Sequence, residues 1–96
     1  MSDSDAVHPP AFCYRLLAHK GAGVAPRVME YFAKRDLVPE RFLLRAGAET
    51  LAIEVDVTGL DEAAAGHIAR CLANIAEVER VALTTQDAAE GLRATA

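Results

Sequence analysis

The residues of this chain that could carry chemistry gather in one short segment, His-Lys-Gly-Ala-Gly at positions 19–23, and are otherwise scattered. Its two glycines allow backbone angles closed to other residues and let the chain pass close to a ligand. A helix is predicted to begin directly after it, so unpaired N–H groups and the positive end of the helix dipole favour a carboxylate there. Lys20 adds a full positive charge. We therefore expect a carboxylate-binding site formed by His19, Lys20, Gly21, Ala22, Gly23 and Val24.

The same segment has a second interpretation. Both glycines can serve only to make a tight turn from a strand into a helix, and Lys20 can simply be solvated. The residues alone leave both interpretations open.

Catalytic and metal sites find little support in the remaining polar residues. None of His8, His19 and His67 has a neighbouring cysteine or carboxylate at metal-ligand spacing. Glu54 and Asp56 lie two positions apart on a predicted strand and so share a face, but acids on an exposed strand face usually meet only water. We predict no catalytic residue, no metal and no cofactor, and expect a protein that is not an enzyme.

The two cysteines, Cys13 and Cys71, lie 58 positions apart and form no C-x-x-C motif. They are interpreted as small buried side chains in a reducing compartment. The first dozen residues are acidic and contain a Pro-Pro pair, and no run of 18 apolar residues occurs. These features indicate a cytoplasmic protein without a membrane segment.

Length and charge set the class of protein. A chain of 96 residues and 10.2 kDa forms one small domain. A net charge of −4 and a pI of about 5.2 argue against nucleic acid as a partner. We expect a flexible N-terminal arm at residues 1–10, one domain at residues 11–85 and a C-terminal tail at residues 86–96.

Hydrophobic periodicity predicts the elements that position the candidate site. Alternating apolar residues predict strands at 12–18, 50–58 and 79–84, and a hairpin turn at Ala46-Gly47-Ala48-Glu49 predicts a further strand at 41–45. Pro26 is tolerated only in the first turn of a helix, which places that helix start at Val24 or Ala25. Asp61 is the expected N-cap of a second helix, whose apolar stripe is predicted to be Ala64, Ile68, Cys71, Leu72 and Ile75.

The predicted order is strand, helix, strand, strand, helix, strand. Right-handed crossovers leave few ways to connect it. We expect a ferredoxin-like α/β sandwich, in which a four-stranded antiparallel sheet carries two helices on one face.

The run LLAHKGAGVAPRVMEYFAKRDLVPERFLL resembles the start of an ACT domain, the small-molecule-sensing module of amino-acid metabolism. Gly23 and Val24 match the Gly-Val pair of the family's loop, although Lys20 stands where Asp is frequent there. The turn after the helix commonly carries Gly and Asn in the family, and here those positions hold Asp36 and Val38. The resemblance adds Val38 to the candidate ligand-binding residues.

Over residues 12–84 the chain looks most like the short regulatory subunit of acetohydroxyacid (acetolactate) synthase, which starts branched-chain amino-acid synthesis. That resemblance implies a branched-chain amino-acid effector and a catalytic enzyme subunit as partner. From the fold itself, edge pairing of the second strand with its copy would complete an eight-stranded sheet, so we expect a homodimer.

Two other classes of protein with this fold are acylphosphatases and RNA-binding domains. Acylphosphatases place an Arg in the first loop and an Asn on the second strand, whereas Arg27 lies in the predicted helix and residues 41–45 contain no Asn. A small acylphosphatase-like enzyme acting on an anionic substrate remains the alternative. The RNA-binding version has aromatic residues on its central strands, and the third predicted strand has none.

Overall fold

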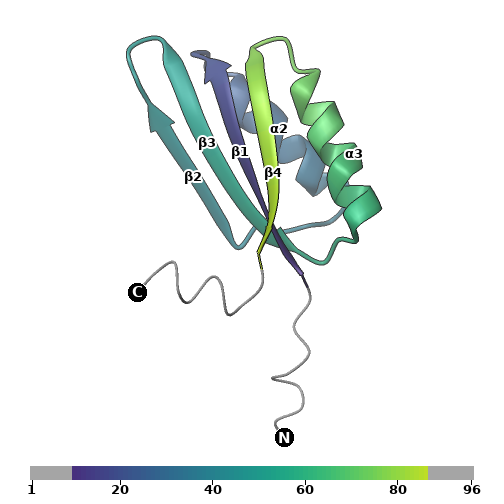
Figure 1. The fold of residues 1–96 in the computed structure, drawn as a ribbon. Coiled ribbons are helices and arrows are strands. Elements are labelled where there is room, and N and C mark those ends of the chain that lie inside the picture. The colour runs from purple at the N-terminus through teal and green to yellow at the C-terminus, as the bar shows by residue number, and fades with distance from the viewer. Residues whose placement is uncertain (1–9, 87–96) are drawn as a thin grey trace, which may run out of the picture.

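The computed structural model describes residues 10–86, which form four strands and two helices in the predicted order (Figure 1). The strands are β1 (Ala11–His19), β2 (Arg41–Ala46), β3 (Thr50–Thr58) and β4 (Val78–Gln86); the helices are α2 (Val24–Ala33) and α3 (Glu62–Ala73). The predicted arm (residues 1–10) and tail (86–96) lie almost wholly outside the described residues. The ferredoxin-like order is confirmed.

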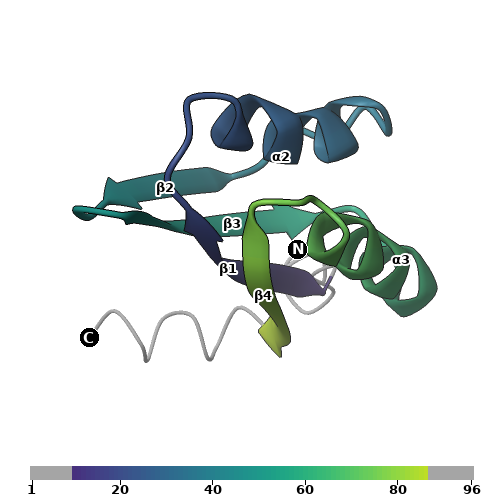
Figure 2. The ribbon, with the colours of Figure 1, turned by 90° about the horizontal axis from the view of Figure 1, so that it is seen from above.

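The four strands form one antiparallel sheet in the order β2-β3-β1-β4. β1 lies in the middle and pairs along its length with β3 and with β4, while β2 and β4 are the two edges. Both helices lie on the same side of the sheet, as Figures 1 and 2 show, and within residues 10–86 the other side carries no helix. The sheet therefore has one buried face and one open face.

The core lies between the sheet and the two helices. Alternate residues of β1 and β3 point into it, as the period-2 patterns predicted. Helix α2 contributes Val24, Val28 and Phe32. The buried strand residues of this core are Phe12, Tyr14, Leu16, Ala18, Leu51, Ile53, Val55, Val57 and Val78.

Helix α3 begins where predicted, because the Asp61 carboxylate accepts a hydrogen bond of 2.8 Å from the Ala64 N–H. Its buried stripe, however, is Ala65, Ile68 and Leu72, whereas Ala64 and Cys71 are half-buried. The predicted stripe was thus rotated by one position at its start. Ala65, Ile68 and Leu72 have the i, i+3, i+7 spacing of one helix face, and the Tyr14 hydroxyl donates to the Ala65 carbonyl at 2.9 Å on that face.

The turn after α2 holds Asp36 in the left-handed region, with φ of 60°. The Leu37 N–H bonds the Phe32 carbonyl at 3.0 Å, and the Asp36 N–H bonds the Ala33 carbonyl at 2.9 Å. This is the Schellman pattern that usually has glycine at its left-handed position.

The two cysteines are both free thiols in different environments. Cys13 is buried on the open side of β1, opposite Asp56 of β3, and burial, followed by a hydrogen bond to Asp56, raises the pKa of its thiol to about 11. Cys71 is half-buried on α3, with its Sγ 3.6 Å from Nε2 of His67. Only the first matches the prediction of two buried side chains.

Among residues 10–86, no helix has the length and apolar character needed to span a membrane.

We predict that Asp36→Gly stabilises the protein by about 0.5–1 kcal/mol, because a left-handed backbone strains any residue that has a Cβ atom. The measurement is urea unfolding at neutral pH. Asp36→Asn should change the free energy of unfolding by less than Asp36→Gly, since asparagine tolerates this region. Equal stability of the Gly and Asp forms would contradict the strain.

The thiols should differ in reactivity, because the nucleophile in disulfide exchange is the thiolate and Cys13 keeps its proton well above neutral pH. At pH 8, Ellman's reagent should titrate one thiol in the native protein and two after unfolding. Cys71→Ser should remove the native reaction, and Cys13→Ser should leave it intact. Fast labelling of Cys13 in the native state would show that this side chain is not buried.

Candidate ligand-binding site

A cavity of about 480 Å³ lies between the start of α2 and the β2–β3 hairpin, on the helix-bearing side of the sheet. It joins the loop after β1 to two leucines of the sheet, one on β2 and one on β3. The lining residues are Lys20, Gly21, Ala22, Ala25, Leu44 and Leu51. The cavity wall is thus largely apolar, with one cationic side chain at the loop.

The loop enters α2 through a tight turn in which the Val24 N–H bonds the Gly21 carbonyl at 3.3 Å. Gly23 is the N-cap, and it has no side chain to accept a helix N–H. Within residues 10–86, no acceptor is found for the N–H groups of Ala22 and Gly23. Pro26 lies in the first turn, where it removes one further donor that would have had no helical partner. The helix start therefore keeps the open donors that the sequence predicted.

Lys20 is exposed, and it makes two hydrogen bonds to the β2–β3 hairpin. Its Nζ donates to the Gly47 carbonyl of the β2–β3 hairpin at 3.0 Å, and its backbone N–H donates to the Glu49 carbonyl at 3.0 Å. An ammonium group has three donors, so two remain after the bond to Gly47. Lys20 therefore holds a positive charge at the mouth of the cavity and ties the loop to the hairpin.

Gly21 and Gly23 do not use the wider range of backbone angles that glycine allows. In the described part of the chain, the glycine with positive φ is Gly59, at 91°. A Cβ atom on Gly21 would lie 3.5 Å from a Val24 methyl, an ordinary contact, and one on Gly23 would meet nothing within 4 Å. The turn itself does not require glycine, and its backbone is left open to the surroundings.

The structure does not bring all the predicted site residues together. Lys20, Gly21 and Ala22 line the cavity, and Gly23 adjoins them at the helix start. His19 is turned toward β4, where its Nε2 lies 3.0 Å from a carboxylate oxygen of Glu79.

Val24 and Val38 also lie away from the cavity. The Val24 side chain is buried in the core. Val38 is 84% exposed and follows the far end of α2, about 15 Å along the helix from the loop. Within one chain, Val38 is therefore too far from the loop of residues 20–23 to share a ligand site with it.

Three lining residues were not identified from the sequence: Ala25, Leu44 and Leu51. Leu44 carried a usable signal, since it is a large apolar residue on the strand that the expected homodimer places at the edge of the sheet; in the structure it is 46% exposed. Leu51 was placed correctly on the buried face of β3, but nothing in its spacing separates a cavity wall from an ordinary core position.

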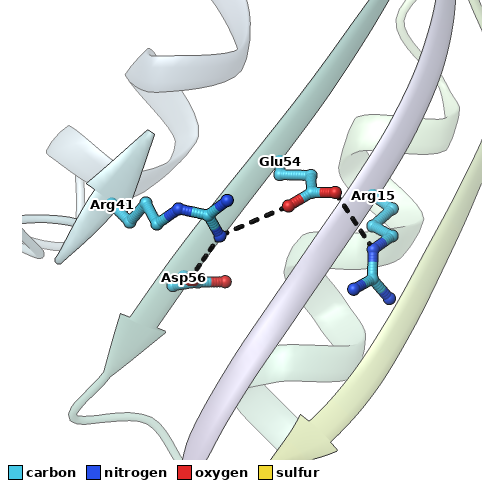
Figure 3. A network of polar contacts seen from close by, with 4 residues as sticks. All are labelled: Arg15, Arg41, Glu54 and Asp56. Carbon is cyan, nitrogen blue, oxygen red and sulfur yellow. Dashed lines mark hydrogen bonds and ion pairs between the residues drawn. The ribbon is translucent and has the colours of Figure 1, made fainter. Parts of the chain in front are cut away.

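The acidic pair on β3, Glu54 and Asp56, takes part in ion pairs (Figure 3). Because side chains alternate along a strand, both acids lie on the face of β3 opposite to Leu51, which lines the cavity. Arg41 Nη1 lies 3.1 Å from Asp56 Oδ2 and 3.3 Å from Glu54 Oε1, and Arg15 Nε lies 3.3 Å from Glu54 Oε2. The hydrogen bond to Asp56 raises the pKa of Arg41 above its usual range. These carboxylates are neutralised in place and lack the shielded pocket that acid–base catalysis needs.

Metal ligation and acylphosphatase chemistry also lack their residues. Residues 10–86 contain no group of three or more His, Cys, Asp or Glu side chains that could hold a metal ion. Arg27 lies inside α2, and its Nη1 is 3.5 Å from Glu77 Oε1 rather than at the loop. The arginine of an acylphosphatase loop has no counterpart here.

Several solved structures share this fold at low sequence identity. The ACT domain of a GTP pyrophosphokinase from Chlorobium tepidum matches with a TM-score of 0.69 and 12% identity over 77% of this chain and 96% of its own. The C-terminal domain of the MgtC protein from Mycobacterium tuberculosis matches with a TM-score of 0.67 and 14% identity over 84% and 92%.

A homoserine dehydrogenase from Thiobacillus denitrificans matches with a TM-score of 0.68 and 14% identity, over 83% of this chain and 18% of the enzyme. The similar region is therefore one part of a much longer protein.

A search of curated proteins found no match. The family model described as an ACT-like domain matches residues 8–90, nearly the whole chain. With the βαββαβ order and the structural similarity to an ACT domain, this match shows that the chain belongs to the ACT-like domain family of regulatory, amino-acid-binding modules.

Proposed function

We propose that this protein is a dimeric, non-catalytic regulatory module of the cytoplasm that binds a branched-chain amino acid at the loop of residues 20–23. In this role it modulates a biosynthetic enzyme, for which acetolactate synthase is the candidate that the sequence resemblance suggests. The observation that carries the proposal is the cavity itself, in which a hydrogen-bonded ammonium group and open helix N–H groups adjoin an apolar wall.

The cavity has groups that suit the carboxylate and the aliphatic side chain of a branched-chain amino acid. A carboxylate at the loop would meet the Lys20 ammonium and the N–H groups of Ala22 and Gly23, which are the donors that favour an anion at a helix N-terminus. Leu44, Leu51 and Ala25 offer a surface for a short aliphatic side chain. The volume of about 480 Å³ falls within the range of small-molecule sites.

The exposed leucines of β2 support dimer formation, because a second copy of the chain could cover them. Leu43 is 38% and Leu44 46% exposed, and they point to opposite sides of an edge strand whose outer backbone groups have no strand partner among residues 10–86. Pairing β2 with its copy across a two-fold axis would cover both leucines and bring the second chain to the rim of the cavity.

Modulation of an enzyme is supported by where the fold occurs. The homoserine dehydrogenase and a formyltetrahydrofolate deformylase from Pseudomonas putida KT2440 are covered over 18% and 28% of their lengths. In those proteins the fold is one part of a chain named as an enzyme. We propose that this separate chain acts on its enzyme in trans.

Ligand binding is tested with Gly23→Ala. A Cβ atom at this position meets no protein atom within 4 Å, so the variant should fold, with a melting temperature slightly below the wild-type value because glycine is preferred to alanine at an N-cap. The same atom projects beside the loop N–H groups, so the dissociation constant for leucine or valine should rise at least tenfold. Thermal melts at millimolar ligand measure both quantities, because a ligand that binds only the folded state raises its stability.

Leucinamide, which lacks the carboxylate, should produce no thermal shift with the wild type. Gly66→Ala, a matched change on α3 far from the loop, should keep the full response to leucine. A wild type that shows no shift with leucine, isoleucine or valine would overturn ligand binding and leave the docking role standing.

The dimer is tested by Leu43→Lys, which places two like charges near the proposed two-fold axis. Light scattering at micromolar concentration should give about 20 kDa for the wild type, twice the chain mass of 10.2 kDa, and half of that for the variant. Thr84→Lys on the opposite edge strand β4 is the matched control and should remain dimeric. A wild-type mass near 10 kDa would contradict the dimer.

A further inference from the structure

The open face of the sheet is ordered in rows by the strand register. Arg45 lies opposite Ala52, Ala52 opposite Leu17, and Leu17 opposite Arg80, so these four residues form one row across β2, β3, β1 and β4. Neighbouring strands lie about 4.8 Å apart, so the row is about 14 Å long. It has an arginine at each end and two apolar residues between them.

In the described part of the chain, this row of the open face has two cations and no acid. The next two rows contain Glu54 and Asp56, which already pair with Arg15 and Arg41 (Figure 3). Among residues 10–86, no carboxylate lies within 4.0 Å of the charged groups of Arg45 or Arg80. In a chain with a net charge of −4, this end of the open face is locally positive.

Glu79 is the nearest acid along β4. It lies in the irregularity where the register shifts between Leu17 and Ala18, and it pairs with His19 at 3.0 Å. Its carboxylate is therefore engaged at the end of β1 rather than along the row.

A hollow lies beside the row, over β3, β1 and β4, where Ala52 of the row and Ala82 of the neighbouring row have small side chains. A depression of about 340 Å³ is lined by Arg15, Leu16, Leu17, Ala52, Arg80 and Ala82. Ala52 and Ala82 leave room for an incoming apolar side chain, and the aliphatic stems of Arg15 and Arg80 form part of the wall.

We propose that this row is a docking surface for an acidic segment of a partner protein, in which carboxylates flank one apolar residue. The end arginines would take the carboxylates and the hollow would take the apolar side chain, which is a complementary pattern of charge and shape. This inference rests on the docking part of the proposed function and assigns it to the face opposite the cavity.

The geometry favours a polypeptide over other anions. Two charges about 14 Å apart exceed the reach of a small carboxylate, whereas five extended residues span about 16 Å. A nucleic acid would carry its phosphates onto the neighbouring rows, where Glu54 and Asp56 stand, and into the field of an acidic protein.

The direct test measures the binding of three dye-labelled peptides, EELEE, QQLQQ and KKLKK, by fluorescence anisotropy. EELEE should bind the full-length protein, with an affinity that falls as salt rises from 50 to 300 mM, and the other two should bind at least tenfold more weakly. Arg45→Glu and Arg80→Glu should each weaken the binding of EELEE at least tenfold.

Arg70→Glu is the matched control, because it makes the same change of charge at an exposed position on α3. It should change the affinity for EELEE less than twofold, and thermal melts should show all three variants folded. No binding of EELEE at millimolar concentration, or an equal loss in Arg70→Glu, overturns the docking surface.

A second measurement separates this proposal from the proposed function. The measurement is how much catalytic subunit each of three tagged proteins retains in a pull-down. The three proteins are the wild type, Arg70→Glu and the double variant Arg45→Glu/Arg80→Glu. A subunit held by the first two and lost by the double variant supports the docking surface. A subunit held equally by all three overturns the docking surface and leaves the docking role intact.

Discussion

The fold depends on the burial of Tyr14 at the middle of the central strand. Its ring meets Phe32 of α2 edge to face, with centroids 5.3 Å apart, and its hydroxyl reaches the Ala65 carbonyl of α3. One side chain therefore contacts both helices and fixes how each sits on the sheet. Burial also raises the pKa of its hydroxyl to about 12, so the group stays neutral and able to donate throughout the physiological range.

Most of the fold could be predicted from short-range patterns. The alternation Leu51, Ile53, Val55, Val57 specified a half-buried strand, and Pro26 and Asp61 marked the starts of the two helices. These signals are local, because each depends on residues within one strand or one helical turn. The spacing within α3 fits the buried stripe of Ala65, Ile68 and Leu72, but it does not separate Ala65 from Ala64, because both are alanines. What distinguishes Ala65 in the structure is a contact with Tyr14, which lies 51 positions away in the sequence.

The candidate site was only half predictable for the same reason. Lys20 and the two glycines predicted a cationic loop before a helix. In the structure Lys20 and Gly21 line the cavity, and Gly23 lies next to it at the helix start. That Lys20 is held by the Gly47 carbonyl, and that Leu44 forms a wall, follows from how the β2–β3 hairpin folds back toward the loop. The glycines were predicted for a conformational reason that the backbone does not have, and their value is the space that they leave.

The cavity and the hollow lie on opposite faces of the sheet and are lined by consecutive residues of β3. Leu51 lines the cavity and Ala52, the next residue, lines the hollow of the open face, since successive side chains of a strand point to opposite sides. The cavity and the hollow are thus separated by the thickness of a single backbone. Any displacement of this strand segment changes both surfaces at once, so the molecule needs no long relay of side chains to couple an event on one side to an event on the other.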